Sequence, residues 1–260
     1  MSLTYGKYLE IDQLLALQKP RSPEPEHDEM LFIIIHQVYE LWFKEILHEL
    51  AWLQRSLGAQ DTPAALATLH RILTVLKTLV AQIDVLETMT PVSFLSFRSR
   101  IESASGFQSL QFRQVEFVLG HRQLGMLKHL PEGSPERKRL EALAEGPSVW
   151  DSFLSYLSVQ GHPIPQEILD RDFKQPHETS EEVQAVLVDI YRTEPWIRQL
   201  CERMVDLDEG LQEWRYRHVK MVERTIGTKQ GTGGSAGAAY LKKTLFQPLF
   251  PDLWEIRIAL

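Results

Sequence analysis

The sequence has 260 residues, of which 43% are hydrophobic and 24% are charged. This is the composition of a soluble globular protein with a sizeable core. The formal net charge is -7 and no lysine and arginine block stands out, so nucleic acid is not an expected partner. Cys201 is the single cysteine, which excludes an internal disulfide, a CxxC redox pair, a thiolate zinc cluster and CxxCH attachment of a cofactor.

No segment is expected to cross a membrane. The longest fully apolar run covers residues 30–35, far short of the roughly 20 residues that a span needs. Met1 is followed by polar sequence and not by a signal peptide. The sequence therefore predicts a cytoplasmic protein.

The first long helix is expected to begin at Asp28 and Glu29, because acidic residues suit a helix N-terminus. In the apolar stretch that follows, Phe32, His36 and Phe43 are spaced to share one helix face.

A second long helix is expected from Thr62, read as the capping residue, with Pro63 at the first helical position. Apolar residues then alternate steps of three and four up to Ile83, which is typical of a long helix packed against others. A shorter helix is expected over 134–146, and a capping box at Thr179 predicts another.

The last long helix is expected over residues 195–225. Its apolar residues again step by three or four, and His218 falls on that apolar stripe. No stretch shows the alternation that a sheet requires. The sequence predicts an all-α fold built as a bundle of long helices.

Two histidines, His36 and His218, lie on the apolar faces of two different long helices. One such histidine is more often a hydrogen-bonded core residue than a ligand. Two of them on facing helices favour a haem or metal site, which bundles build in this way. Sequence spacing does not decide whether both would bind iron or one would face an open coordination position.

A di-iron site is less favoured, since it needs two Glu-x-x-His pairs. Glu45 and His48 form one pair, whereas the other match, residues 24–27, lies in a proline-broken connection. Glu45 and His48 are more simply polar positions of an amphipathic helix. The zinc signature HExxH is absent.

The glycine-rich loop GTGGSAG spans residues 231–237. It fits a relaxed dinucleotide pattern, but that pattern must follow a strand and this loop follows a helix. Its backbone amides could converge on an anion beside the hydroxyl of Thr232. A helix C-cap at Gly227 with a flexible loop explains the glycines equally well.

Phe94 and Arg98 are spaced to share a helix face. A guanidinium beside aromatic rings can hold a carboxylate through two hydrogen bonds. The alternative is an exposed arginine whose stem lies on an aromatic ring.

Five stretches taken together resemble the tryptophan 2,3-dioxygenase family of bacteria. They are LTYGKYL (3–9), HDEMLFIIIHQVYELWFKE (27–45), LETMTPVSFLSFR (86–98), SGFQSLQFR (105–113) and WRYRHVKMVERTIGTKQGTGGSAG (214–237). The resemblance implies one all-α domain over residues 1–260, a homotetramer, and non-covalent haem b that is ferrous when active. It also implies that both atoms of O2 are inserted across the indole C2–C3 bond of L-tryptophan to give N-formylkynurenine.

The resemblance assigns roles around the haem. His218 matches the axial ligand of the iron, and His36 matches the distal, catalytic histidine near the indole N–H. Phe32 matches an apolar wall of the indole pocket, and Ser105 matches a small polar residue of the haem cavity.

The resemblance also assigns the substrate contacts. Arg98 matches the residue that holds the substrate carboxylate, and Thr232 matches the hydroxyl at the amino-acid end. Phe94 stands near the substrate where bacterial relatives often carry tyrosine. The N-terminal segment, residues 1–20, is expected to complete a neighbouring subunit's pocket through Tyr5, Tyr8 and Leu9.

Two rival functions stay open from the sequence. One is a related haem oxygenase that acts on another indole and inserts one oxygen atom or two. The other is a haem-binding sensor without turnover. The presence of both Arg98 and Thr232 favours an amino-acid substrate, because an uncharged indole would give the arginine nothing to bind.

Overall fold

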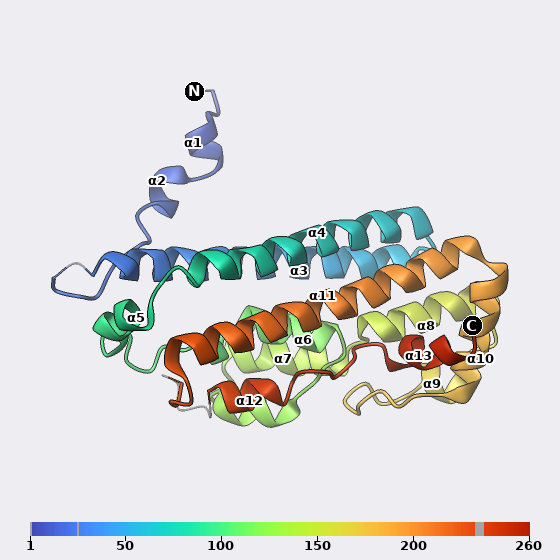
Figure 1. The fold of residues 1–260 in the computed structure, drawn as a ribbon. Helices are drawn as coiled ribbons and strands as arrows, with labels where there is room; N and C mark the ends of the chain where they lie inside the picture. Colours follow the sequence, from blue (N-terminus) through green and yellow to red (C-terminus); the bar gives the residue numbers. More distant parts are fainter. Residues whose placement is uncertain (1, 25, 232–236) are drawn as a thin grey trace.

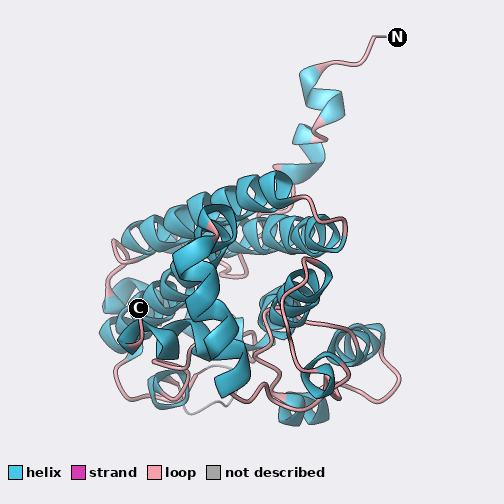
Figure 2. Cartoon of the chain, turned by 90° about the vertical axis from the view of Figure 1, so that its right-hand side faces the viewer, coloured by secondary structure: helices cyan, strands magenta, loops and turns pink. Residues whose placement is uncertain are grey.

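The computed structural model describes residues 2–24, 26–231 and 237–260. These residues form helices joined by loops, and they contain no strand (Figure 2). The prediction of an all-α fold is confirmed.

Three long helices dominate the fold, namely α3 (His27–Gly58), α4 (Thr62–Leu86) and α11 (Pro195–Ile226). The shorter α-helices are α1 (Tyr5–Tyr8), α2 (Ile11–Leu14), α5 (Pro91–Arg98), α6 (Leu110–Val118), α7 (Pro135–Glu145), α8 (Val149–Val159), α9 (Gln166–Leu169), α10 (Glu181–Thr193), α12 (Ala238–Lys242) and α13 (Pro251–Glu255). Three 3-10 helices span Gly106–Gln108, Leu124–His129 and Ile256–Ile258.

The helix starts follow local hydrogen bonding more closely than the sequence pattern suggested. Asp61 caps α4 by accepting from the backbone N–H of Ala64 (3.0 Å), so Thr62 is the first helical residue and not the cap. Ser180, and not Thr179, caps α10. The prediction at Thr179 was wrong by one residue because Asp252 accepts from the backbone N–H of Ser180 (2.9 Å) and holds it at the helix entrance.

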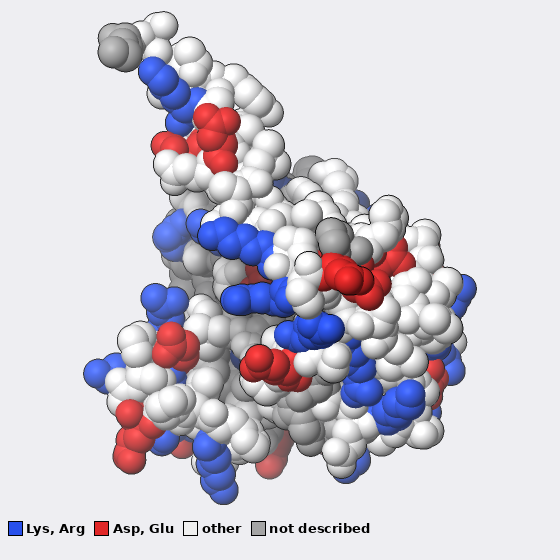
Figure 3. Space-filling view, turned by 90° about the vertical axis from the view of Figure 1, so that its left-hand side faces the viewer, with Lys and Arg blue, Asp and Glu red and all other residues white. Residues whose placement is uncertain are grey.

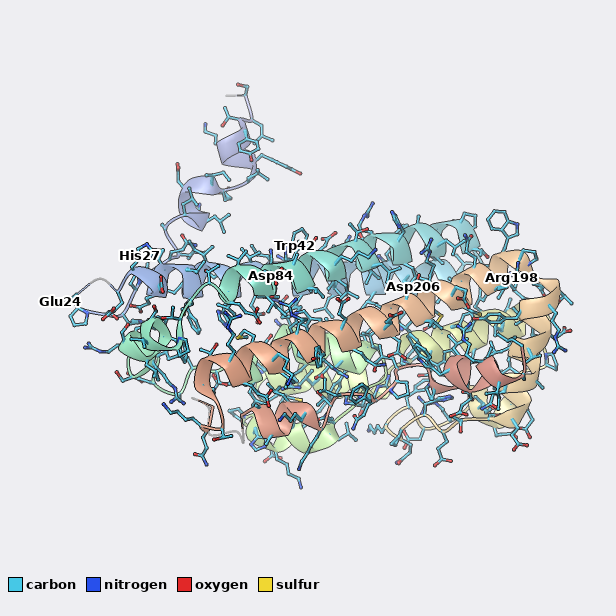
Figure 4. The ribbon with its side chains drawn as sticks, in the orientation of Figure 1. Glu24, His27, Trp42, Asp84, Arg198 and Asp206 are labelled. Carbon is cyan, nitrogen blue, oxygen red and sulfur yellow. The ribbon has the colours of Figure 1, made fainter. Side chains whose placement is uncertain are left out.

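The long helices lie side by side, with α4 packed against both α3 and α11 (Figure 1). The hydroxyl of Tyr39 on α3 donates to the backbone carbonyl of Leu79 on α4 (2.8 Å). On the other side of α4, Asp84, which Figure 4 labels, accepts from Arg217 of α11 (2.6 Å). These links hold α3 and α11 at fixed positions on either side of α4.

A continuous apolar core joins this layer to α6, α8 and α10. Near the chain end, Asp208 of α11 is fully buried and accepts from the backbone N–H of Leu249 (2.8 Å) and from the indole N–H of Trp254 (2.9 Å). A buried carboxylate needs several donors, so Asp208 ties the C-terminal segment firmly to α11.

Among the described residues, α4 is long and apolar enough to cross a membrane by length and composition alone. The core helix of a soluble protein passes the same test. Leu69, Ile72 and Leu79 of α4 are almost fully buried against neighbouring helices, which is the environment of a core helix.

Candidate functional site

A cavity opens between α3, α5, α6 and the C-terminal half of α11. Its empty volume, the open mouth included, is about 1630 Å³. The lining is mostly apolar and includes a few polar and charged side chains. Figure 3 looks onto the α5 end of the molecule, where Lys and Arg side chains border a hollow in the surface.

His218 lines this cavity from α11. Its ring stacks on Trp214, one turn earlier, with centroids 5.2 Å apart and planes 11° apart. Burial, with smaller contributions from the nearby His36 and Arg113, lowers the pKa of His218 to about 4. No described residue forms a hydrogen bond to the His218 ring, so this imidazole is neutral and its lone pair is free to bind a metal.

His36 lines the same cavity from α3. Its Nδ1 lies 2.7 Å from the backbone carbonyl of Phe32. A carbonyl only accepts, so Nδ1 carries the proton and Nε2 keeps a lone pair. Burial lowers the pKa of His36, although the Phe32 carbonyl and Glu40 raise it in part. His36 is therefore positioned as a neutral hydrogen-bond acceptor.

Three phenylalanine rings build an apolar wall beside His36. The ring of Phe32 lies 4.1 Å from that of His36, 5.7 Å from that of Phe94 and 5.5 Å from that of Phe97, measured between centroids. Phe32 and Phe94 line the cavity, and Phe94 is 8% exposed. This wall suits a flat apolar group such as an indole ring.

Arg98, the last residue of α5, lines the cavity at the same end. Its Nη2 donates to the backbone carbonyl of Gln230 (2.5 Å), which joins α5 to the glycine-rich loop. Thr232 lies outside the described residues. Gly231 and Gly237 also line the cavity, and Gly237 has a φ of 59°.

A side chain at Gly237 would not fit. An added Cβ would lie 2.7 Å from the backbone carbonyl oxygen of Lys229. The loop therefore needs glycine here for both its backbone conformation and its close approach.

Ser105 lines the cavity and also caps the 3-10 helix Gly106–Gln108. Its Oγ accepts from the backbone N–H of Phe107 (3.3 Å). The hydroxyl hydrogen can still donate to a ligand in the cavity.

The N-terminal residues are not brought to this cavity within one chain. Tyr5 and Tyr8 are 76% and 71% exposed, and Leu9 is 42% exposed. They lie on or next to α1, which stands away from the helical body (Figure 1).

The structure adds a charged group that the sequence analysis missed. Arg113 and Glu116 of α6 and Arg215 of α11 line the cavity, and each is at most 5% exposed. Arg113 and Glu116 are three residues apart on one helix, so their pairing could have been predicted from the sequence. Nothing in the sequence links residue 116 to residue 215.

The rival metal sites find little support. His48 is exposed on the outer side of α3. Within residues 2–24, 26–231 and 237–260, no group of three or more His, Cys, Asp or Glu side chains is placed to hold a metal ion.

The fold and the cavity define an α-helical protein with a mostly apolar pocket, lined by two neutral histidines and three arginines. Comparison with known proteins gives the family. The family model described as tryptophan 2,3-dioxygenase matches residues 1–133 and 151–260. The chain belongs to the tryptophan 2,3-dioxygenase family, a haem-dependent family of oxidoreductases.

Similar proteins cover the chain almost end to end. A tryptophan 2,3-dioxygenase of Herpetosiphon aurantiacus is 60% identical over 256 residues, which are 98% of each chain. One of Anaeromyxobacter dehalogenans is 58% identical over 261 residues, which are 100% of this chain and 97% of the other. One of Bacillus cereus is 42% identical over 263 residues, which are 100% of this chain and 93% of the other.

Proposed function

We propose that this protein is a haem-dependent dioxygenase that inserts both atoms of O2 across the indole C2–C3 bond of L-tryptophan, giving N-formylkynurenine. Family membership supports the reaction. The observation that carries the proposal is the neutral imidazole of His218, which has no hydrogen-bond partner among the described residues and faces a cavity that also holds Arg98.

The cofactor proposed is haem b, held without a covalent bond and ferrous when active, and His218 would bind its iron. The site fits this group in three ways. The cavity is large and mostly apolar, the imidazole is unprotonated, and stacking on Trp214 fixes the imidazole plane. When bound, the haem supplies the iron chemistry that activates dioxygen.

The chain's own residues bind and orient the substrate. Phe32 and Phe94 would pack on the indole ring, while Nε2 of His36 would accept a hydrogen bond from the indole N–H. Such contacts hold the ring in one orientation. Orienting two reactants in advance removes much of the entropic part of the reaction barrier. Because insertion at C2 and C3 leaves the indole nitrogen bonded to hydrogen, His36 would position the ring without having to remove that proton.

The other end of the substrate is charged. Burying a zwitterion in an apolar cavity is costly unless each charge is paired. Arg98 would hold the carboxylate through its guanidinium, and Thr232 of the glycine-rich loop would contact the amino-acid end. The hydrogen bond from Arg98 to the carbonyl of Gln230 supports this arrangement, since it brings the loop next to the guanidinium.

We further propose a cytoplasmic homotetramer of single-domain chains, each domain spanning residues 1–260. Residues 1–20 of one chain would reach a neighbouring subunit's pocket through Tyr5, Tyr8 and Leu9. Their high exposure on a segment that stands away from the helical body supports this role.

One experiment tests the function directly. The haem-loaded protein is reduced under air and given L-tryptophan, and in parallel indole without its side chain, with products followed by absorbance and mass. We expect N-formylkynurenine from L-tryptophan and little product from indole. A product heavier by one oxygen atom, or a preference for bare indole, would favour a related oxygenase with another substrate. Absence of turnover by the haem-loaded protein would favour a sensor.

A further inference from the structure

Three buried charged residues form one hydrogen-bonded group on the cavity wall, called here the cationic cluster: Arg113, Glu116 and Arg215. Nη1 of Arg113 donates to Oε2 of Glu116 (2.7 Å), and Nη2 of Arg215 donates to Oε1 of the same carboxylate (2.9 Å). The three residues are 5%, 2% and 4% exposed. All three line the cavity that holds His218.

The charges of this cluster do not cancel. It holds two guanidinium groups, which stay protonated, and one carboxylate. Nε of Arg113 is buried and has no hydrogen-bond partner among the described residues. The guanidinium instead lies 4.8 Å from the ring centre of Phe107.

The neighbouring groups leave the excess positive charge in place. Burial and then Arg215 lower the pKa of His121, so this imidazole is neutral and does not change the charge of the cluster. Glu40 lines the cavity on the His36 side, where it accepts from Nε2 of Gln111 (2.9 Å). With Arg98 at the mouth, the cavity wall carries three arginines and two carboxylates.

A purely structural role explains only part of the cluster. Glu116 with Arg215 ties α6 to α11, and Nη1 of Arg215 also donates to the backbone carbonyl of Thr244 (3.4 Å). That tie needs one arginine and one glutamate. Arg113 adds a second buried positive charge, which is costly in an apolar interior and is unnecessary for joining the two helices.

We propose that the cationic cluster raises the reduction potential of the haem bound at His218 and so holds the iron in its ferrous state. This inference rests on the proposed function. Reduction adds one electron to the iron centre, and a positive charge nearby in a low-dielectric cavity stabilises the electron-richer state. Groups beyond the direct ligands commonly tune a metal in this way.

The geometry of α11 places the cluster near the proposed ligand. Arg215 lies three residues before His218 on this helix, a spacing that makes the two side chains neighbours, and both line the cavity. A positive charge at this position opposes the additional positive charge of a ferric centre.

The test measures the reduction potential of the haem-loaded protein by spectroelectrochemical titration. Arg113→Met removes a positive charge, and at fixed potential we expect the ratio of ferrous to ferric haem to fall about tenfold or more. A unit charge within about 10 Å at an effective dielectric constant of about 20 has an effect of this size, and tenfold corresponds to about 59 mV for one electron. Glu116→Gln should shift the ratio in the opposite direction, while Arg113→Lys, which keeps the charge, should shift it much less than Arg113→Met.

Glu49→Gln is the matched control. Glu49 is 4% exposed and paired with Arg71 (2.7 Å), but it does not line the cavity. The chemical change equals that of Glu116→Gln, and the potential should stay at the wild-type value.

The outcomes separate this inference from the proposed function. Wild-type potentials in haem-loaded Arg113→Met and Glu116→Gln would overturn the inference alone. If every cluster variant, including Arg113→Lys, loses its fold by circular dichroism or fails to hold haem, the cluster is a structural tie and the inference is also overturned. If wild-type protein binds no haem, or His218→Ala keeps an unchanged Soret band, the proposed function fails instead.

Discussion

Arg98 offers the sharpest test of how the proposed substrate is held. It lies at the end of α5, lines the cavity and is partly buried. Arg98→Ala removes the guanidinium while leaving the phenylalanine wall and both histidines in place. We expect the KM for L-tryptophan to rise sharply, because the substrate carboxylate would enter the cavity without its counter-charge.

The size of this effect follows from the cost of an unpaired charge. Truncating one partner of a buried, hydrogen-bonded charge pair costs about 2–5 kcal/mol. Arg98 is only partly buried, so we expect the lower end of this range, about 2–3 kcal/mol. At about 1.4 kcal/mol per factor of ten, KM should rise roughly 30- to 150-fold.

The assay is steady-state formation of N-formylkynurenine with haem content matched between variants. Tryptamine, which lacks the carboxylate, provides an internal comparison. For wild-type protein, kcat/KM should be lower on tryptamine than on L-tryptophan by about the same factor by which Arg98→Ala lowers kcat/KM on L-tryptophan. On tryptamine, kcat/KM of Arg98→Ala should be little lower than that of wild type. Such non-additivity is expected when two changes remove the same interaction.

Two further variants test which property of Arg98 matters and whether a nearby arginine has the same effect. Arg98→Lys keeps the charge but loses the planar fork, so its KM should lie between wild type and Arg98→Ala. Arg100→Ala removes an exposed arginine two residues further on and should leave KM unchanged. Unchanged kinetics in Arg98→Ala, or equal and additive losses on both substrates, would show that Arg98 does not hold the carboxylate.

Three other predictions concern the histidines. His218→Ala should lose most bound haem, measured as the pyridine haemochrome per chain; full haem content with the wild-type spectrum would show that another residue binds the iron. His36→Ala should keep its haem but turn over L-tryptophan more slowly without losing activity, since His36 positions the indole N–H; equal kcat in variant and wild type would remove that role. Because burial lowers the pKa of His218 from its usual 6.5 to about 4, the unfolded chain takes up the proton first on acidification. The contribution of His218 to the unfolding free energy of the haem-free protein should therefore be fully present above pH 6.5. It should fall by up to about 3 kcal/mol as the pH is lowered to 4. Urea titrations of wild type and His218→Leu at several pH values would measure this contribution as the difference between their unfolding free energies. If the unfolding free energies of the two proteins changed in parallel with pH, the prediction would be contradicted.

Much of the helical framework could be predicted from the sequence because its signals are local. The apolar stripe over 195–225 predicted a helix that the structure gives as Pro195–Ile226. The same stripe placed His218 on the packed side of this helix. Periodicity of this kind reports which side of a helix is buried, so it also placed His36 and Phe32 correctly on one face of α3.

Features that depend on tertiary contacts could not be predicted in this way. The cap of α10 is Ser180, whose backbone N–H donates to Asp252, some seventy residues later in the chain. The cationic cluster joins Glu116 to Arg215 across a still longer separation. Sequence reasoning showed single charged positions, whereas their burial and pairing depend on the packing of α6 against α3 and on the hydrogen bond from Arg215 of α11.

The site needs an open cavity, whereas the stability of the fold needs a packed core. The arrangement of the helices meets both requirements. A cavity of this size forgoes the packing that normally stabilises a core. Hydrogen bonds to α4 hold its two neighbours in place: Tyr39 of α3 donates to the carbonyl of Leu79, and Arg217 of α11 donates to the carboxylate of Asp84. With both neighbours of α4 fixed in this way, His36 and His218 can face an open space. Their neutral imidazoles follow from the same burial, so the apolar surroundings that make the cavity costly also prepare His218 to bind iron and His36 to accept from the substrate.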